Sequence, residues 1–500
     1  MRVGTASVMR HIDSCTINEI GIPGIVLMEN ASREVLNYLL GKAEDNFCII
    51  CSKGNNGGDG FALARQLFVM GKRVEVFLVG GDQGMSSDCR INYEAAKGTG
   101  IEIISINSEA GIAELNRAMD ECDLAVDAIF GTGLTRNVEG IYSSVIDAVN
   151  AHTIFVAAID VPSGLNSDTG RISGNCIEAD VTVTFELYKK GFLYYKAQKY
   201  TGDIVPVKIG IPEKAVIKYH EGEYILDSAM IRDKVKVRNR YSNKSDFGRV
   251  LIIAGAEGYS GAAYICATSA VRSGSGLVTL ACEQQIRNML SQRLTEAMTI
   301  SFEESLMLEG HISRSDAIAI GPGMGNSRET LDLVRNVLEN AKCPVVIDAD
   351  GLNALKNNLE MLDSRKCEVV ITPHPGEMSR LSGYEIGYIE ENRSEVAKEF
   401  ALKHGVTVLL KGYNTVITDG NELFYNSTGS SAMASGGMGD CLTGIIASFI
   451  GQGYGTLEAA YLAAYIHGYS GDVLSEELYS VNATHVMEEI PYAIKEIIDS

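Results

Sequence analysis

The sequence predicts an α/β protein of two domains, each built on a mostly parallel sheet with helices on both faces. At 500 residues the chain is too long for a single core. Short, entirely apolar runs, such as 47–51 and 317–320, recur in both halves and suit strands that are covered on both faces. Most of these runs lead into a glycine-containing loop and then a helical pattern. This alternation is typical of parallel α/β sheets.

Composition and charge narrow the possible partners and the compartment. A hydrophobic content of 46% and a charged content of 21% are those of a globular protein. The formal net charge of −21 argues against nucleic acid and anionic membranes as partners. No apolar run approaches the length of a membrane span, and the N-terminus lacks the blocks of a signal peptide. We therefore expect a cytoplasmic protein.

The eleven cysteines are scattered, mostly in apolar runs. Buried free thiols in a reducing compartment are the expected result. The C-x-x-C pattern at 48–51 lies within an expected strand, which would point its two thiols to opposite faces. A redox or metal role for this pair is therefore not favoured.

In the first half, an apolar stripe at helical spacing covers residues 8–40 and is interrupted at 21–24. The strands and helices expected after it are 47–51, 61–70, 74–79, 88–98, 101–104, 124–130 and 154–160. Three strand-end loops combine glycine with acidic or hydroxyl residues, at 53–60, 127–134 and 160–166. Because parallel strands end at one edge of the sheet, these loops should line one crevice.

We place the first domain at 1–212, a polar connector and entry element at 213–247, and the second domain at 248–500. The basic residues of the connector are interpreted as a solvated face. The second domain repeats the alternation, with apolar runs at 249–255, 317–320, 344–350, 369–372 and 406–412, a small-residue helix at 262–273 and a hairpin around 419–421.

The stretch 435–444 has the clearest chemical signature, because glycines crowd ahead of an apolar helical run. Glycine N–H groups and the helix N-terminus together would form an anion hole for phosphate. Asp440 within it would repel phosphate unless it accepts a proton from a nucleophilic hydroxyl. A plain glycine-rich turn, with an aspartate that stabilises the helix start, is the alternative.

Several blocks of residues resemble known families. The second half carries G-R-V-L-I-I-A-G at 248–255, Y-S-G-A-A at 259–263, G-P-G-M-G at 321–325, D-A-D-G-L-N at 348–353, T-P-H-P-G-E at 372–377 and G-G-M-G-D at 436–440. These blocks resemble the ADP- or ATP-dependent NAD(P)H-hydrate dehydratases, which have a ribokinase-like α/β/α fold. The first half carries G-N-N-G-G-D-G at 54–60, D-A-I-F-G-T-G-L at 127–134, D-V-P-S-G-L-N at 160–166 and A-D-V-T-V-T-F at 179–185. It resembles the NAD(P)H-hydrate epimerases, with a Rossmann-like three-layer α/β/α fold.

The resemblance of the second half implies a substrate and a chemistry. The substrate would be NADH or NADPH with water added across the nicotinamide 5,6 double bond, and ADP or ATP would phosphorylate the C6 hydroxyl, ADP giving AMP and phosphate. Asp440 would be the catalytic base. Ala263, Gly325, His374 and Asp440 would contact the hydrate, and Lys411, Gly412, Tyr413, Asn414, Thr415 and Gly439 would contact the adenine nucleotide, with Mg²⁺ as its companion. A rigid turn residue is the alternative role for His374.

The resemblance of the first half implies epimerisation of the R and S hydrates at C6, with Asp160 as acid and base. A turn-initiating aspartate before Val161-Pro162 is its alternative role. The substrate contacts would be Asn55, Asn56, Gly57, Gly58, Asp59, Gly131, Thr132, Gly133, Leu134, Thr135, Arg136, Asn137, Tyr142 and Asp160. Asn56, Asp127 and Ser163 offer only oxygen ligands, which suit a hard cation, and the family implies K⁺. Packing of these polar loop ends through water is the alternative.

The sequence departs from the dehydratase pattern at Ser430, Ser431 and Asn243, which leaves the choice between ADP and ATP open. Two further functions fit parts of the chain. A kinase of a small hydroxylated metabolite would explain the glycine-rich stretch, and a nucleotide-binding module without catalysis would explain the folds alone. We also expect a homo-oligomer, from the resemblance only.

Overall fold

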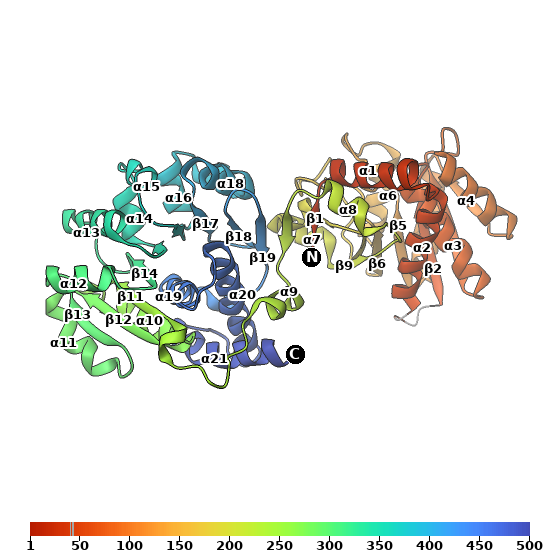
Figure 1. The fold of residues 1–500 in the computed structure, drawn as a ribbon. Helices are drawn as coiled ribbons and strands as arrows, with labels where there is room; N and C mark the ends of the chain where they lie inside the picture. The colour runs from red at the N-terminus through yellow and green to blue at the C-terminus, as the bar shows by residue number, and fades with distance from the viewer. Residues whose placement is uncertain (41, 43–44) are drawn as a thin grey trace. The chain divides into compact units, whose positions relative to one another are not determined.

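The computed structural model describes residues 1–40, 42 and 45–500. These residues divide into two compact units, Met1–Glu221 and Gly222–Ser500 (Figure 1). The expected connector, 213–247, is not a linker but is shared between them, since α8 (Glu213–Tyr219) belongs to the first unit and β10 (Glu223–Ile225) to the second. Strand β10 pairs with a strand of the second sheet, and Leu226, Ile231 and Val235 lie in the core of that unit. Because these apolar residues are part of the core of the second unit, this part of the expected connector belongs to that unit.

Over the described residues, the first unit has a seven-stranded parallel sheet with the order β4-β3-β2-β5-β6-β7-β9. Its strands are β2 (Asn46–Cys51), β3 (Arg73–Val79), β4 (Ile103–Ile106), β5 (Leu124–Ala128), β6 (Phe155–Ile159), β7 (Val181–Phe185) and β9 (Asp203–Val207). A separate pair joins β1 (Val3–Gly4) to β8 (Tyr188–Lys189). The strand order reverses between β2 and β5. Ligands of such sheets bind beyond the carboxyl ends of the strands at this switch point.

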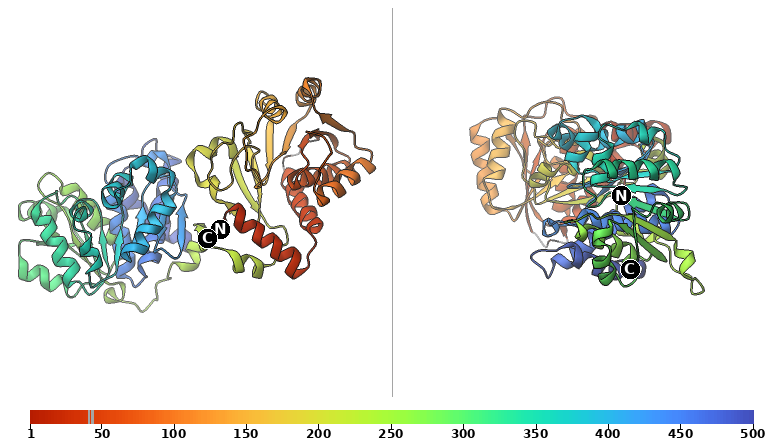
Figure 2. Two further views of the ribbon diagram at one scale, coloured as in Figure 1. Left: turned by 90° about the horizontal axis from the view of Figure 1, so that it is seen from above. Right: turned by 90° about the vertical axis from the view of Figure 1, so that its left-hand side faces the viewer.

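Helices cover both faces of this sheet (Figure 2). One apolar cluster joins a face of the sheet to α1 (Ala6–Ser14), α2 (Gly24–Leu40), α3 (Asn55–Val69), α4 (Ser87–Gly98) and α8, and the other joins the opposite face to α5 (Glu109–Glu121) and α6 (Ile141–Asn150). Cys51 lies in the first cluster and Cys48 in the second, as the strand period predicts. Short helices complete the unit: η1 (Cys15–Ile20), η2 (Lys190–Leu193), η3 (Tyr195–Ala197) and α7 (Gln198–Thr201).

In the described part of the second unit, the sheet has ten strands in the order β10-β19-β18-β17-β16-β15-β14-β11-β12-β13. All neighbours are parallel except β18, which runs antiparallel to both of its neighbours and forms the expected hairpin with β19. The strands are β11 (Arg249–Ile253), β12 (Leu277–Cys282), β13 (Met298–Ser301), β14 (Ala317–Ile320), β15 (Val345–Ile347), β16 (Val369–Ile371), β17 (Thr407–Leu410), β18 (Thr415–Thr418) and β19 (Leu423–Asn426).

One face of this sheet is covered by α10 (Ser260–Arg272), α19 (Met438–Gly451), α20 (Thr456–Ser475) and α21 (Ala483–Asp499), which share a core with its strands. Figure 1 shows helices α13 to α16 and α18 on the other side. The other helices are α9 (Ser228–Lys234), η4 (Lys244–Phe247), α11 (Gln284–Arg293), α12 (Ser305–Ile312), α13 (Arg328–Asn340), α14 (Asp350–Leu355), α15 (Glu360–Asp363), α16 (Pro375–Ser382), α17 (Ile386–Glu391), α18 (Arg393–His404) and η5 (Ser431–Met433). Both units therefore have the predicted α/β class.

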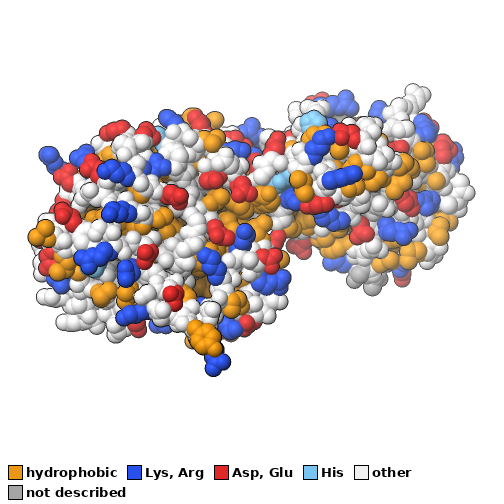
Figure 3. Space-filling model, viewed as in Figure 1, with side chains coloured by type: hydrophobic (Ala, Val, Ile, Leu, Met, Phe, Trp, Pro, Cys, Tyr) orange, Lys and Arg blue, Asp and Glu red, His pale blue; other side chains and the backbone are white. Residues whose placement is uncertain are grey.

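The surface mixes charges of both signs. On the face drawn in Figure 3, Lys and Arg side chains are interspersed with Asp and Glu. Within the described residues, no helix combines the length and the apolar character that crossing a bilayer requires. All eleven cysteines are free thiols, and all but Cys122 and Cys367 are buried, as predicted.

Helix α19 packs so closely on α10 that one position requires glycine. A Cβ atom on Gly444 would lie 2.2 Å from the carbonyl oxygen of Cys266, which is backbone and cannot rotate away. We predict that Gly444→Ala destabilises the second unit by about 1–3 kcal/mol. Its unfolding temperature should fall by roughly 2–4 °C for each kcal/mol, measured by calorimetry.

Gly261→Ala is the matched control, because no atom lies within 4 Å of the added Cβ in α10. The control should be neutral or slightly stabilising, since alanine favours a helix over glycine by about 0.5–1 kcal/mol. Equal unfolding temperatures for both variants would contradict the close packing.

Candidate active sites

Four parallel strands of the second unit end at one edge of the sheet and bring three predicted site residues together with Asp348. Strand β14 leads to Gly325, β15 to Asp348, β16 to His374 and β17 to Lys411. The start of α19 lies beside them, since a Cβ atom on Gly439 would be 3.2 Å from Lys411 Nζ and 3.6 Å from Asp348 Oδ2. The edge therefore brings together groups that are more than 100 residues apart in the sequence.

Helix α19 begins earlier than the apolar run suggests. Gly437 adopts φ 89° as its N-cap, and the helix starts at Met438, so Asp440 lies in the first turn. The reason is packing, since every residue from Cys441 to Gly451 is buried and the helix is held along its whole length. Within the described structure, the N–H groups of residues 438–440 make no hydrogen bond. An unpartnered helix N-terminus of this kind binds anions such as phosphate.

An ion pair between the partly exposed Lys411 and the buried Asp348 lies under this helix start. Lys411 Nζ is 2.8 Å from Asp348 Oδ1, and Thr443 Oγ1 donates to Asp348 Oδ2 at 2.8 Å. Burial alone would raise the pKa of Asp348, but the charge of Lys411 and these hydrogen bonds outweigh it and lower the pKa below its ordinary value. For Lys411, burial opposes the charge, while Asp348 and Glu377 raise the pKa. Both groups therefore stay ionised.

The pKa of the Asp440 carboxyl is shifted in the opposite direction to that of Asp348. Burial, followed by the negative charge of Asp348, raises the pKa of Asp440 to about 6, and Lys411 opposes this only in part. Asp440 is thus a stronger base than an exposed aspartate and is still mostly ionised at pH 7. Two neighbouring carboxyls with pKa values pushed apart are typical of an acid–base site.

His374 has a structural role that the sequence left open. It is the N-cap of α16, where its Nδ1 accepts from Gly376 N at 3.0 Å and its backbone N–H donates to Glu377 Oε2 at 2.9 Å. Burial and the charge of Lys411 lower the pKa of His374, so the ring is neutral at pH 7. Half of the side chain is exposed. The ring can therefore cap the helix and still present Nε2 to a ligand.

The other residues expected to contact the hydrate differ in how far they are exposed to a ligand. Gly325 adopts φ 76° with no atom within 4 Å of a Cβ position, and its N–H donates to Asp350 Oδ2 at 2.8 Å. Ala263 is fully buried, and its Cβ would lie 2.6 Å from a Cβ on Gly255. The methyl group of Ala263 therefore fills the space beneath the edge, while Gly325 lies open.

The loop expected to contact the nucleotide, 411–415, joins β17 to β18. Tyr413 is half-exposed, Asn414 adopts φ 49°, and Thr415 Oγ1 donates to Gly412 O at 3.0 Å. Arg393 supports the loop from α18, where its Nη2 donates to Leu410 O at 2.8 Å.

The structure shows the surroundings of the three positions at which the sequence departs from the dehydratase pattern. Asn243 caps η4, where its Oδ1 accepts from Ser245 N at 2.9 Å. Ser430 Oγ is buried and makes no hydrogen bond in the described structure. Ser431 begins the short helix η5 next to it.

In the first unit, α3 begins at Asn55, six residues before the helical run expected from the sequence. Gly57 explains how the helix fits against β2, because a Cβ there would lie 1.8 Å from Ser52 O. Asn55 is exposed and accepts from Ser86 Oγ at 2.6 Å. Gly58 and Asp59 are buried with Asn56 and Gly57.

The three residues expected to bind K⁺ lie together. Ser163 Oγ donates to Asp127 Oδ1 at 2.6 Å, and Ser163 N donates to Oδ2 at 2.7 Å. Asn56 is held by Nδ2, which donates to Ile159 O at 3.0 Å, whereas its Oδ1 is buried without a hydrogen-bond partner in the described part of the chain. Burial raises the pKa of Asp127 to about 6. An orphaned amide oxygen beside a buried carboxyl fits the coordination chemistry of a hard cation.

Asp160 follows β6 in a conformation that is rare for a residue with a side chain, with φ 65°. Its Oδ1 accepts from Phe185 N at 3.1 Å and Thr184 Oγ1 at 3.3 Å. Lys189 Nζ forms an ion pair with the same oxygen at 2.8 Å. A strained backbone held by several bonds is more typical of a functional site than of a simple turn.

The loop 131–137 beside these residues is open. Gly133 and residues 135–137 are exposed, and Thr132 and Leu134 are half-buried. A Cβ on Gly131 would lie 3.2 Å from Asn56 Nδ2, so the loop passes close to the cation candidate. Tyr142 packs on Phe130, with ring centroids 5.0 Å apart, and its hydroxyl donates to Val79 O at 3.3 Å.

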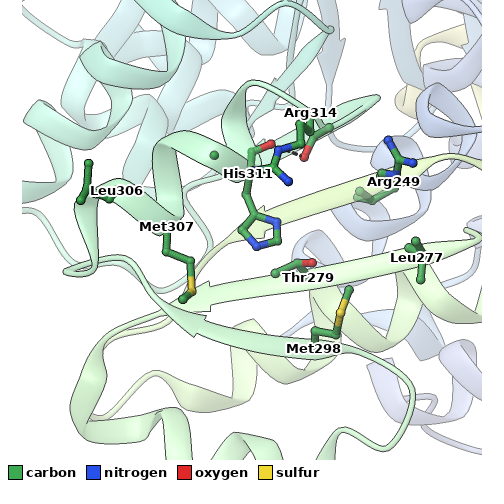
Figure 4. Close-up of a pocket in the computed structure, with 11 residues that line it drawn as sticks. Arg249, Leu277, Thr279, Met298, Leu306, Met307, His311 and Arg314 are labelled. Carbon is green, nitrogen blue, oxygen red and sulfur yellow. Dashed lines mark hydrogen bonds between the residues drawn. The ribbon is translucent and has the colours of Figure 1, made fainter.

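A pocket of about 410 Å³ in the second unit lies away from its candidate site. It is lined by the first residues of β11, β12 and β13, which are Arg249, Leu277 and Met298, and by α12 (Figure 4). These are the amino ends of parallel strands, whereas Asp440 and Lys411 lie at the carboxyl ends. The pocket is therefore separate from the candidate active site of the second unit.

Comparisons with known proteins also divide the chain into two parts. The family described as NAD(P)H-hydrate dehydratase matches residues 250–492, and the family described as YjeF-related protein N-terminus matches residues 24–191. A bifunctional NAD(P)H-hydrate repair enzyme from Moorella thermoacetica is 38% identical over 99% of this chain and 97% of its own length. The chain belongs to the bifunctional NAD(P)H-hydrate repair enzyme family. The Escherichia coli member is 34% identical over 86% of this chain and 81% of its own length.

Solved structures support the fold of the second unit. A ribokinase-like superfamily protein from Enterococcus faecalis matches at a TM-score of 0.53 and 31% identity, covering 56% of this chain and 99% of that one. A hypothetical protein from Streptococcus mutans matches at 0.50 and 33%, covering 55% and 99%. The ribokinase-like prediction is confirmed. Family membership makes the chain an enzyme of NAD(P)H-hydrate repair, with epimerase and dehydratase activities, and favours repair over the small-metabolite kinase and the inert module.

Sequence reasoning missed several residues at these sites. Asp348 follows β15 in a strand-end block to which no residue role was given, and Thr443 lies one helical turn beyond Asp440. Lys189 gave no motif signal, because its contact with Asp160 comes from the fold. His467 is buried on α20, where burial and the charge of Lys411 lower its pKa to about 4.

The ion pair gives a stability prediction. Lys411→Met should destabilise the second unit by about 3–5 kcal/mol, because it leaves the buried Asp348 carboxylate without its cation. The double variant Asp348→Asn with Lys411→Met should recover part of this loss, as measured by urea unfolding at pH 7. An equal loss in the single and double variants would contradict it. Because the pKa of Asp348 is lowered on folding, the stabilisation is present above the unfolded pKa and disappears as pH falls through the folded pKa.

Proposed function

We propose that the second unit dehydrates the S hydrate of NADH or NADPH through a phosphorylated intermediate. Hydroxide is a poor leaving group, so Asp440 takes the proton of the C6 hydroxyl as its oxygen attacks the terminal phosphorus of ADP. The C6–O bond then breaks with its electron pair on phosphate. Loss of a proton from C5 restores the 5,6 double bond, and the products are NAD(P)H, AMP and phosphate.

The observation that carries this proposal is the half-buried Asp440 carboxyl in the first turn of α19, with a pKa raised to about 6. A base must be ionised yet strong enough to accept a proton, and this value satisfies both needs near pH 7. The unpartnered N–H groups of residues 438–440 supply hydrogen bonds to the transferring phosphoryl group. Lys411 adds a positive charge beside them.

We assign the adenine nucleotide to Lys411, Gly412, Tyr413, Asn414, Thr415 and Gly439, and the hydrate to Ala263, Gly325, His374 and Asp440. In the described residues, no group of three or more His, Cys, Asp or Glu is arranged to hold a metal ion. Mg²⁺ commonly binds through substrate phosphates and one or two carboxylates, and Asp348 and Glu377 offer carboxylates beside Lys411. The ion would neutralise charge on the phosphates.

For the first unit we propose epimerisation of the two hydrates at C6, with Asp160 as acid and base. Asn55 to Asp59, the loop 131–137 and Tyr142 would hold the substrate. The strained backbone of Asp160 and its bond to Lys189 support this assignment. K⁺ bound by Asn56, Asp127 and Ser163 would fix the loop ends on which the substrate rests. Free thiols throughout the chain fit a cytoplasmic location, and a homo-oligomer stays a prediction.

Asp440→Asn should lower the dehydration rate by about 10²–10⁴, because general-base assistance is worth that much. In the unsubstituted enzyme, kcat/KM should fall tenfold per pH unit below about pH 6, where the carboxyl of Asp440 becomes protonated. The dehydration rate of the variant and the pH dependence of kcat/KM are both measured by the recovery of reduced nicotinamide absorbance from the S hydrate with ADP. Epimerisation by the same preparation is the control. Dehydration at the original rate in the variant would contradict the assignment of Asp440 as the base.

K⁺ should stabilise the first unit. If K⁺ binds at Asn56, adding it at about 100 times its Kd should stabilise that unit by about 2.7 kcal/mol, equivalent to roughly 5–10 °C in its unfolding temperature. Tetramethylammonium at the same ionic strength is the control ion. Asn56→Ala should remove the difference between the two ions. A difference that survives in this variant would refute the site.

A further inference from the structure

Arg380 presents an unpaired guanidinium beside the candidate active site of the second unit. It lies in the last turn of α16 and is exposed. Its Nε donates to Asn353 Oδ1 at 3.0 Å. Within the described residues, Nη1 and Nη2 make neither a hydrogen bond nor an ion pair with the protein. The side of the guanidinium that these two nitrogens form is therefore free to bind a ligand.

The hydrogen bond to Asn353 ties the guanidinium to the loop that carries Gly325. Asn353 Nδ2 donates to Asp350 Oδ1 at 3.3 Å, and Gly325 N donates to Asp350 Oδ2 at 2.8 Å. These bonds join α16 and α14 to the loop after β14. Because Gly325 is assigned to the hydrate, Arg380 is fixed relative to a substrate-binding loop by a continuous chain of hydrogen bonds.

His374, which is also assigned to the hydrate, lies close to the same guanidinium. A Cβ on Gly376 would lie 3.2 Å from His374 Nδ1 and 3.8 Å from Arg380 Nη1, so both side chains border one point at the start of α16. The charge of Arg380 contributes to the lowered pKa of His374, after burial and Lys411. Arg380 therefore neighbours two separate parts of the site.

The carboxylates around Arg380 are already bonded to other groups. Glu377 Oε2 accepts from the backbone N–H of His374 at 2.9 Å and lies 4.0 Å from Lys411 Nζ. Glu377 Oε1 lies 3.5 Å from His374 Nε2, and Asp350 is held by the bonds described above. In a chain with a net charge of −21, an anionic substrate needs such a local cation to offset repulsion.

The position of the proposed base decides which part of the hydrate reaches Arg380. Lys411 Nζ lies 3.2 Å from a Cβ on Gly439, the residue before Asp440, and 4.0 Å from Glu377 Oε2 on α16. With Asp440 as the base, the nicotinamide ring lies against α19, and the pyrophosphate follows it along the substrate after one ribose. The extra phosphate of NADPH is at the far, adenosine end. The group that meets Arg380 is therefore the pyrophosphate.

We propose that Arg380 binds the pyrophosphate of the NAD(P)H hydrate through Nη1 and Nη2 and so positions the substrate for dehydration. The proposal rests on the function proposed above for the second unit. A planar guanidinium can donate two parallel hydrogen bonds to two phosphate oxygens, whereas an ammonium group acts only as a point charge. An arginine, held at Nε and free at both Nη atoms, suits this recognition.

The test measures dehydration of the S hydrates of NADH and NADPH by the full chain with saturating ADP. Arg380→Gln should raise KM for both hydrates about 10- to 100-fold and leave kcat nearly unchanged, because it removes binding that the ground state and the transition state share. Arg380→Lys keeps the charge without the fork and should give an intermediate KM. Arg328→Gln removes an exposed positive charge from the same unit and, as the control, should match the unsubstituted enzyme.

The outcomes separate this inference from the proposal beneath it. Dehydration by the unsubstituted enzyme with an unchanged KM in Arg380→Gln would overturn the role of Arg380 alone. A rise of KM confined to the NADPH hydrate would place Arg380 at the adenosine end and overturn the pyrophosphate assignment. A raised KM for ADP or a lowered unfolding temperature in Arg380→Gln would show a nucleotide-binding or structural role instead. Absence of dehydration by the unsubstituted enzyme would overturn the underlying function.

Discussion

Parallel strand direction is the constraint on which both candidate sites depend. When neighbouring strands run the same way, all their carboxyl ends meet at one edge, and the loops that follow must share it. In the second unit this edge gathers Asp348, His374 and Lys411, and in the first it gathers Asn56, Asp127 and Asp160. A helix start, α19 or α3, then adds backbone N–H groups at the same place.

The two units have a similar arrangement of charged residues. Each holds a lysine against one aspartate, the partly exposed Lys411 with Asp348 and the buried Lys189 with Asp160. Each also has a further aspartate, Asp440 or Asp13, whose pKa is raised to about 6. The ion pair keeps one carboxylate charged at a fixed position, and that charge contributes to the raised pKa of the other. Acid–base chemistry near neutral pH becomes accessible to residues that are ordinarily strong acids.

The sequence could predict the strands, the loops at their ends and the residues inside dense motifs, because these depend on local pattern. It placed the start of α3 six residues late, since the first turn of this helix is glycine-rich and is held by packing against β2. Lys189 could not be found from the sequence. It is placed by the pairing of β1 with β8, which joins residues about 185 positions apart.

Strand β10 has a practical consequence for dividing the enzyme. It covers the edge of β19 by parallel pairing of Glu223–Ile225 with Leu423–Tyr425. A recombinant dehydratase fragment that began at residue 248, where the family blocks begin, would leave this edge of the sheet bare. Bare edges recruit strands from other chains and promote aggregation. A soluble fragment should therefore begin at Gly222, where the compact unit itself begins.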